Sequence, residues 1–138
     1  MGVFSHPVRV YIEDTDAGGI VFYVNYLKYM ERARTELMRA LGYGKAALFH
    51  RDRMFVVVET QVRYLQAARL DDELAVTAVV CHAGGARLSF EQGVYKGETE
   101  LCTGRVQVAC VDRHSLKPQR IPADMLARLQ AIQATNGE

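Results

Sequence analysis

The pattern of apolar positions begins with a period of two. Over residues 6–12, Val8, Val10 and Ile12 alternate with polar or amphipathic side chains, which predicts a strand. Residues 14–19 are rich in Asp and Gly and predict a turn. The chain is therefore expected to leave its first strand through a polar, glycine-containing loop.

Helical spacing follows this loop. Between Asn25 and Leu41 apolar residues recur every three or four positions, which predicts a helix with one apolar stripe. The stripe consists of Tyr26, Met30, Ala33, Leu37 and Leu41. Asn25 is a candidate N-cap and Gly42 a candidate stop signal. Residues 44–50 predict a further short helical turn.

The second half of the chain predicts strands joined by tight turns. The expected strands are rich in Val and aromatic residues and cover residues 55–64, 73–82, 87–95 and 100–112. Turns at 83–85 and 96–98 would make hairpins, so these strands are expected to be antiparallel. Pro118 and Pro122 separate them from a last amphipathic helix. Its apolar side is formed by Met125, Leu126, Leu129 and Ile132.

The order of elements predicts one α+β domain over residues 1–138: a strand, a long helix, four strands and a short helix. A long helix with one apolar stripe is expected to lie across one face of the sheet. A domain of this kind often assembles through a free sheet edge, so a homodimer is expected.

Composition narrows the possible functions. Hydrophobic residues make up 49% and charged residues 24% of the chain, and the net charge of +1 gives no basis for binding nucleic acid or an anionic membrane. No apolar run approaches the roughly 20 residues that span a bilayer, so no membrane insertion is expected. The N-terminus lacks the features of a signal peptide, which favours a cytoplasmic location.

Cys81, Cys102 and Cys110 are expected to be free thiols, and no Cys or His pair has the spacing of a metal site.

The acidic turn is the candidate reactive site. Asp14 is expected to order the loop, whereas Asp16 lies beside a glycine pair and is the candidate catalytic carboxylate. Gly18 and Gly19 allow backbone to approach a ligand closely, and Gly19 is a candidate substrate contact. A backbone N–H near Tyr23, at the start of the helix, is suited to binding a developing oxyanion.

One longer motif consists of residues 14–26 (DTDAGGIVFYVNY) followed by residues 29–36 (YMERARTE). It resembles the signature of hotdog-fold acyl-CoA thioesterases of the 4-hydroxybenzoyl-CoA thioesterase family. Residues 29–36 are most similar to the bacterial group associated with the Tol-Pal envelope system. The similarity continues through 58–72 and 87–90. It implies a hotdog fold, with an antiparallel sheet wrapped around the long helix and active sites at a homodimer interface. Dimers of this kind can pair into homotetramers. Coenzyme A would be part of the substrate, with no separate cofactor.

The resemblance also assigns roles. Asp16 matches the family's catalytic carboxylate, which attacks the thioester carbonyl or activates a water molecule. The backbone N–H of Tyr23 matches its oxyanion donor. Many members of the Tol-Pal-associated group carry His at this position. A phenol can donate a hydrogen bond but does not act as a base at neutral pH. The 4-hydroxybenzoyl-type enzymes also lack this His, so activity is expected while the exact subgroup and substrate stay open.

Three further positions are candidate substrate contacts. Asn25 orients the acidic loop if it does not cap the helix. Glu59 lies in an apolar strand and would face the site of a partner chain, or else solvent. Arg63 would pair with a carboxylate such as Glu59 or reach a phosphate.

Basic residues of the second half are candidates for the CoA end. Arg87 matches part of a basic cluster that holds CoA phosphates in the 4-hydroxybenzoyl branch, and Lys117 lies near another such position. The cluster is only partly kept, because Ala86 and Leu88 flank Arg87. Ser89 is a candidate pantetheine contact or an ordinary strand hydroxyl.

Two other functions are alternatives to hydrolysis of acyl-CoA or acyl carrier protein thioesters. Hotdog hydratases and dehydratases use His with Asp or Glu, and no His occurs between residues 7 and 49. A non-catalytic acyl-binding or scaffold protein is the alternative from another class. The intact Asp16 and the glycine pair favour catalysis.

Overall fold

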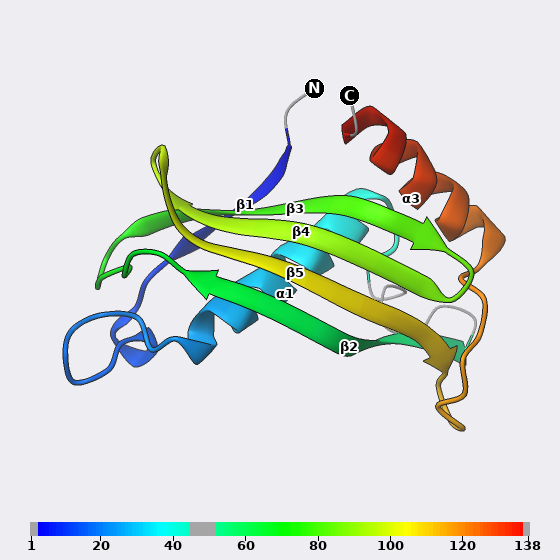
Figure 1. Ribbon diagram of the computed structural model, residues 1–138, viewed down its shortest axis with the longest axis horizontal. Helices are drawn as coiled ribbons and strands as arrows, with labels where there is room; N and C mark the ends of the chain where they lie inside the picture. The colour runs from blue at the N-terminus through cyan, green and yellow to red at the C-terminus, as the bar shows by residue number, and fades with distance from the viewer. Residues whose placement is uncertain (1–2, 45–51, 137–138) are drawn as a thin grey trace.

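The computed structural model describes residues 3–44 and 52–136, in which one sheet wraps around a long helix (Figure 1). The elements are β1 (Phe4–Arg9), the 3-10 turn η1 (Ile12–Asp14), α1 (Val24–Ala40), β2 (Arg53–Tyr64), β3 (Glu73–Gly84), β4 (Arg87–Lys96), β5 (Thr99–Asp112) and α3 (Ala123–Asn136). The strands lie in the order β1-β3-β4-β5-β2, and every neighbouring pair is antiparallel. The expected α+β architecture is confirmed. The short helix expected over residues 44–50 lies, except for Gly44, outside the described residues.

The first strand begins two residues before its predicted start and ends three residues before its predicted end. It ends at Arg9, because the carboxylate of Asp14 accepts the backbone N–H of Tyr11 at 2.8 Å and the chain closes into η1. Ile12, predicted to continue the inward side of the strand, is 76% exposed, while Val10 is fully buried. Local side-chain capping therefore overrides the alternating pattern at this point.

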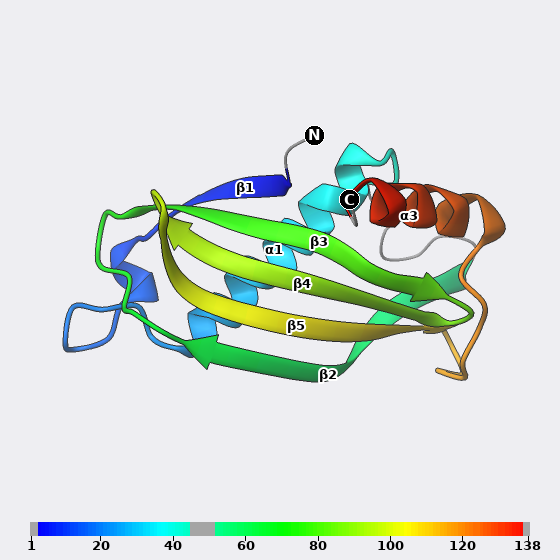
Figure 2. The same ribbon diagram turned by 45° about the horizontal axis from the view of Figure 1, so that its top comes forward.

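Helix α1 lies across one face of the sheet, as the predicted stripe requires (Figure 2). The buried members of the stripe are Tyr26, Met30, Ala33 and Leu37. A Cβ at Gly104 of β5 would lie 2.8 Å from the sulfur of Met30, so this glycine allows the helix to pack closely. Gly42 has φ +96° just beyond the helix end, which confirms it as the stop signal.

One buried polar side chain joins the helix to the sheet. Gln92 of β4 is only 5% exposed, and its Nε2 donates to the carbonyls of Met30 and Thr77 at 2.9 and 3.2 Å. Its Oε1 accepts a 2.9 Å hydrogen bond from Nη1 of Arg34. The side-chain amide of Gln92 thus has partners in both layers.

The hairpin turns are close to their predicted positions. The first was expected at 83–85, but Gly84 still pairs with Arg87, so the two-residue turn falls one position later. Gly85 and Gly97 both have φ +59°, the left-handed conformation that these short turns require.

The β3 side of the sheet is covered along its length. Strand β1 pairs with residues 73–78 of β3. Beyond them, Gln130 and Gln133 of α3 donate to the carbonyls of Ala83 and Cys81 at 3.1 and 3.0 Å. The short C-terminal helix therefore satisfies acceptors that would otherwise form an open edge.

The β2 side of the sheet is open. Its 12 residues, except Val58, pair with β5 on one side, and within the described residues no strand pairs with the other side. The register shifts between Val57 and Glu59, which leaves Val58 unpaired in a bulge. Val57 and Val58 are 52% and 44% exposed. A long, apolar strand edge of this kind is a surface for strand pairing.

The cysteines are free, as expected, and Cys102 and Cys110 are buried. Burial raises the pKa of the Cys102 thiol to about 12 and also raises that of Cys110. Neither thiol is therefore a nucleophile at neutral pH. In the part of the chain that is described, no helix is both long and apolar enough to cross a bilayer.

Candidate active site

The acidic loop is a tight hairpin between η1 and α1 (Figure 1). The N–H of Asp16 donates to the carbonyl of Ile20 at 2.9 Å, and the N–H of Gly19 donates back to the carbonyl of Asp16 at 3.1 Å. Gly19 has φ +80°, which other residues rarely adopt, and open space surrounds its Cα. The glycine pair thus forms the turn that presents Asp16.

The carboxylate of Asp16 is exposed but oriented. Its Oδ1 accepts the backbone N–H of Gly18 at 2.8 Å. A Cβ at position 18 would lie 3.2 Å from this oxygen, so Gly18 keeps the approach clear. Among the residues described, no donor reaches Oδ2. One oxygen therefore fixes the carboxylate, and the other is available to a substrate or a water molecule.

The start of α1 presents two free backbone donors. Tyr23 is the N-cap, with no side-chain cap and no acidic residue in the first turn of this 17-residue helix. The N–H groups of Asn25 and Tyr26 bond to the carbonyls of Phe22 and Tyr23. Those of Tyr23 and Val24 have no hydrogen-bond acceptor within residues 3–44 and 52–136. The helix dipole and these N–H groups together favour an anion or oxyanion here.

Asn25 does not cap the helix, so that prediction is wrong. Its side chain is 8% exposed, and Nδ2 donates to the carbonyl of Asp14 at 2.8 Å. The same carbonyl accepts the N–H of Phe22 at 2.9 Å. Asn25 thus orients the loop, the second role considered for it. Asp14 is structural, as expected, through both its carbonyl and its carboxylate.

Aromatic rings surround the helix start. The ring of Tyr23 is 59% exposed and meets the ring of Tyr64 edge-on, with centroids 5.9 Å apart. Tyr64 also contacts Tyr26 at 5.6 Å, and the hydroxyl of Tyr26 accepts the N–H of Ala68 at 2.9 Å. The Tyr23 side chain is therefore part of an apolar wall, while its backbone forms the donor site.

The segment after β2 supports the acidic loop. The N–H of Val21 donates to the carbonyl of Ala68 at 2.9 Å. Oδ2 of Asp72 accepts the N–H of Arg69 at 2.9 Å, and Oδ1 lies 2.9 Å from Nζ of Lys96. Although burial opposes ionisation of Asp72, these donors outweigh it and lower its pKa. Sequence reasoning missed Tyr64 and Asp72, although both lie in the segment 58–72 that carries part of the resemblance.

Replacing Asp72 with Asn should lower the free energy of unfolding by about 1 kcal/mol at pH 7, because the ion pair to Lys96 is lost. The pKa of Asp72 is depressed in the folded state, so its stabilisation is present above the unfolded value of about 3.9 and is lost as the pH falls through the folded pKa. Urea unfolding at pH 7, 5 and 3 should show the two proteins converging below about pH 4. Asp71→Asn, the exposed neighbour, is the matched control. A constant difference at all three pH values would contradict this origin.

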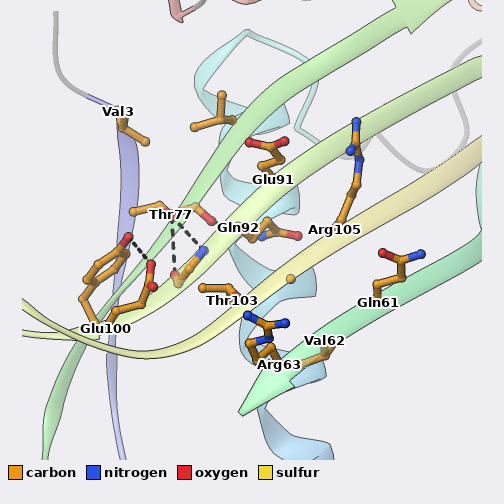
Figure 3. Close-up of a pocket in the computed structure, with 14 residues that line it drawn as sticks. Val3, Gln61, Val62, Arg63, Thr77, Glu91, Gln92, Glu100, Thr103 and Arg105 are labelled. Atoms are coloured by element: carbon orange, nitrogen blue, oxygen red, sulfur yellow. Dashed lines mark hydrogen bonds between the residues drawn. The ribbon is translucent and has the colours of Figure 1, made fainter. Parts of the chain in front are cut away.

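The candidates on β2 lie on the face of the sheet turned away from α1. Figure 3 shows Arg63 among the residues that line a groove of about 710 Å³ on that face, which also include Gln61, Glu91 and Arg105. Glu59 is exposed and, within the described chain, forms no ion pair with Arg63. This groove is lined by neither Asp16 nor Tyr23. Within one chain, the structure therefore does not bring Glu59 or Arg63 to the acidic loop.

The candidate contacts to the CoA part of the substrate also lie far from the acidic loop within one chain. Tyr64, beside Tyr23, pairs with Cys102 of β5, whereas Arg87 pairs with Ala109. The two β5 positions are seven residue steps apart, which is about 23 Å along the strand. Ser89 is on the same strand as Arg87 and is 5% exposed, and Lys117 follows β5 at this far end. The structure thus places Asp16, Gly19, Tyr23 and Asn25 on the acidic loop and the start of α1, and separates them from the basic candidates.

Comparisons with known proteins agree with the geometry. The profile of the thioesterase-like superfamily matches residues 10–129. The acyl-CoA thioesterase YbgC of Haemophilus influenzae is 43% identical over 125 residues, which cover 90% of this chain and 92% of that protein. The acyl-CoA thioester hydrolase YbgC of Escherichia coli O6:H1 is 39% identical over 93% and 96% of the two chains. The crystal structure of a probable thioesterase from Bartonella henselae superposes with a TM-score of 0.77 at 29% identity, over 88% and 98% of the two chains.

Proposed function

We propose that this chain hydrolyses acyl-CoA thioesters to a free acid and CoA, because it belongs to the thioesterase-like superfamily and has the hotdog fold. The observation that carries the proposal is the Asp16 carboxylate, oriented by Gly18, on the loop that leads directly into the uncapped start of α1. Acyl carrier protein offers the same phosphopantetheine thiol and is a possible alternative carrier of the acyl group.

The arrangement supports a simple acyl-transfer mechanism. In one route Oδ2 of Asp16 attacks the thioester carbonyl carbon, the C–S bond breaks, and CoA leaves as a thiolate. Water then hydrolyses the resulting mixed anhydride. In the other route Asp16 removes a proton from a water molecule, which attacks the same carbon. In both routes the oxyanion is held by the free N–H groups of Tyr23 and Val24.

The open β2 edge favours a homodimer. Pairing of two β2 strands about a twofold axis would join the two sheets and cover Val57 and Val58. Because the strands of such a pair run in opposite directions, the acidic loop of one chain comes near the far end of the other sheet. Arg87 and Lys117 would then meet the CoA phosphates bound at the partner's Asp16. This accounts for their separation from Asp16 within one chain. Two such dimers can pair further into a homotetramer.

An acyl-CoA panel tests the function directly. The purified protein is incubated with acetyl- to long-chain acyl-CoA, benzoyl-CoA and 4-hydroxybenzoyl-CoA, and released CoA is followed with a thiol reagent. We expect turnover on at least part of the panel. Binding without turnover on every thioester would favour an acyl-binding protein, and a parallel panel on acyl carrier protein distinguishes the carrier.

A further inference from the structure

Some side chains of β2 are exposed although they lie on the side of the sheet that packs against α1. Val57 and Tyr64 pair with Val108 and Cys102 of β5, which are buried. Side chains that are directly opposite in neighbouring strands point to the same face of the sheet. Val57 and Tyr64 are nevertheless 52% and 45% exposed, so α1 does not cover this part of the sheet.

A matching stripe runs along the flank of α1. Tyr23, Leu27, Met30 and Arg34 are spaced by four, three and four residues and therefore lie along one side of the helix. The sulfur of Met30 packs on Gly104 of β5, which places this flank toward β5 and β2. Tyr23 and Leu27 are 59% and 37% exposed. The exposed apolar part of this flank, Tyr23 and Leu27, thus begins at the free N–H groups and lies on the same side of the helix as Arg34.

The guanidinium of Arg34 is a half-buried cation that pairs with no carboxylate among the described residues. Within residues 3–44 and 52–136, its one hydrogen bond goes to Oε1 of Gln92, a neutral acceptor, although the group carries five N–H donors. No carboxylate in the described residues lies within ion-pair distance of Arg34, and residues 45–51 contain no acidic residue. Burial lowers the pKa of Arg34, while the more distant Glu31 opposes this shift. A cation in this position has spare donors for an anionic ligand.

We propose, resting on the proposed function, that the surface formed by Tyr23, Leu27 and Tyr64 holds the acyl group and that Arg34 selects acyl groups ending in a carboxylate. The preferred substrates are then monothioesters of dicarboxylic acids. Eleven residues separate Tyr23 from Arg34, which is about 16 Å along the helix axis. Because the arginine side chain points back toward the helix start, the remaining gap is on the order of 10 Å and suits a chain of medium length.

A matched pair of substrates tests this assignment. Adipoyl-CoA and hexanoyl-CoA have acyl chains of the same length and differ in the terminal carboxylate. We expect the wild-type protein to hydrolyse adipoyl-CoA with a kcat/KM about tenfold or more above that for hexanoyl-CoA. Arg34→Met should abolish this preference by lowering the adipoyl value and should leave the hexanoyl value within about threefold. Arg34→Lys should keep part of the preference, and Lys28→Met, an exposed cation on the same helix, should keep all of it.

Several results would overturn the assignment. Equal kcat/KM for the two substrates in the wild-type protein would do so without any variant, even if Arg34→Met fails to fold. Equal losses on both substrates in a folded Arg34→Met protein would assign Arg34 to packing, and a change in oligomeric mass would assign it to an interface. Turnover of other acyl-CoA esters but of neither test substrate would reject the inference while leaving the proposed function intact. No turnover of any thioester would reject the function itself.

Discussion

Replacing Asp16 with Asn is expected to lower kcat/KM for acyl-CoA hydrolysis by at least about a thousandfold, because an amide neither attacks a thioester nor accepts a proton from water. The fold should be unchanged. The Asn Oδ1 can still accept the N–H of Gly18, which is the contact that orients the Asp16 carboxylate. The measurement is released CoA under saturating and limiting substrate, together with the circular dichroism spectrum and thermal unfolding of the variant.

Glu13→Gln is the matched control for Asp16→Asn. Glu13 is an exposed carboxylate in η1, three residues away, and its replacement removes the same charge. This variant should retain activity within about threefold, since it contributes only a solvated charge. Full activity in Asp16→Asn would remove Asp16 from the mechanism. A similar loss in both variants would indicate a general effect of charge.

Replacing Val58 with Lys is expected to dissociate the proposed dimer and to lower activity about a hundredfold or more. A charged side chain on an edge strand opposes pairing with a second strand. Val58 is suited to this test because it is unpaired in the bulge and 44% exposed, so the fold of one chain should tolerate the change. The activity should fall because the acidic loop loses the basic residues that a second chain would supply.

Light scattering after size-exclusion chromatography measures the mass, and the acyl-CoA assay measures the activity of the same fractions. Gln66→Lys adds the same charge at an exposed position just after β2 and should change neither. A Val58→Lys protein that is monomeric and fully active would show that one chain is sufficient. An unchanged mass would place the interface elsewhere.

Much of the fold follows from periodicity. The stripe on α1 and the turns at Gly85 and Gly97 depend on local physical preferences, so residue spacing was enough to predict them. The end of β1 and the role of Asn25 were not predictable in this way. In both cases a side chain bonds to the backbone of another segment, Asp14 to Tyr11 and Asn25 to Asp14. Such a bond competes with the regular pattern only once the loop has folded.

The residues of the candidate site also differ in whether local sequence is enough to predict their positions. Asp16 and Tyr23 are close in sequence, so a local motif was enough to assign them to one loop and the helix start that follows it. Tyr64 and Asp72 come from a distant segment, and only the pairing of β2 with β5 brings them to the acidic loop. Arg87 lies at the far end of the sheet for the same reason, since strand direction and register are properties of the whole sheet.

The two edges of the sheet differ in a way that limits the addition of further strands. Short β1, which contains Pro7, and helix α3 close the β3 side, while the β2 side is open. A sheet that can extend in only one direction has no free end left after one pairing. The proposed twofold contact would thus be self-terminating, and the chain could use an apolar strand for recognition without a route to fibres.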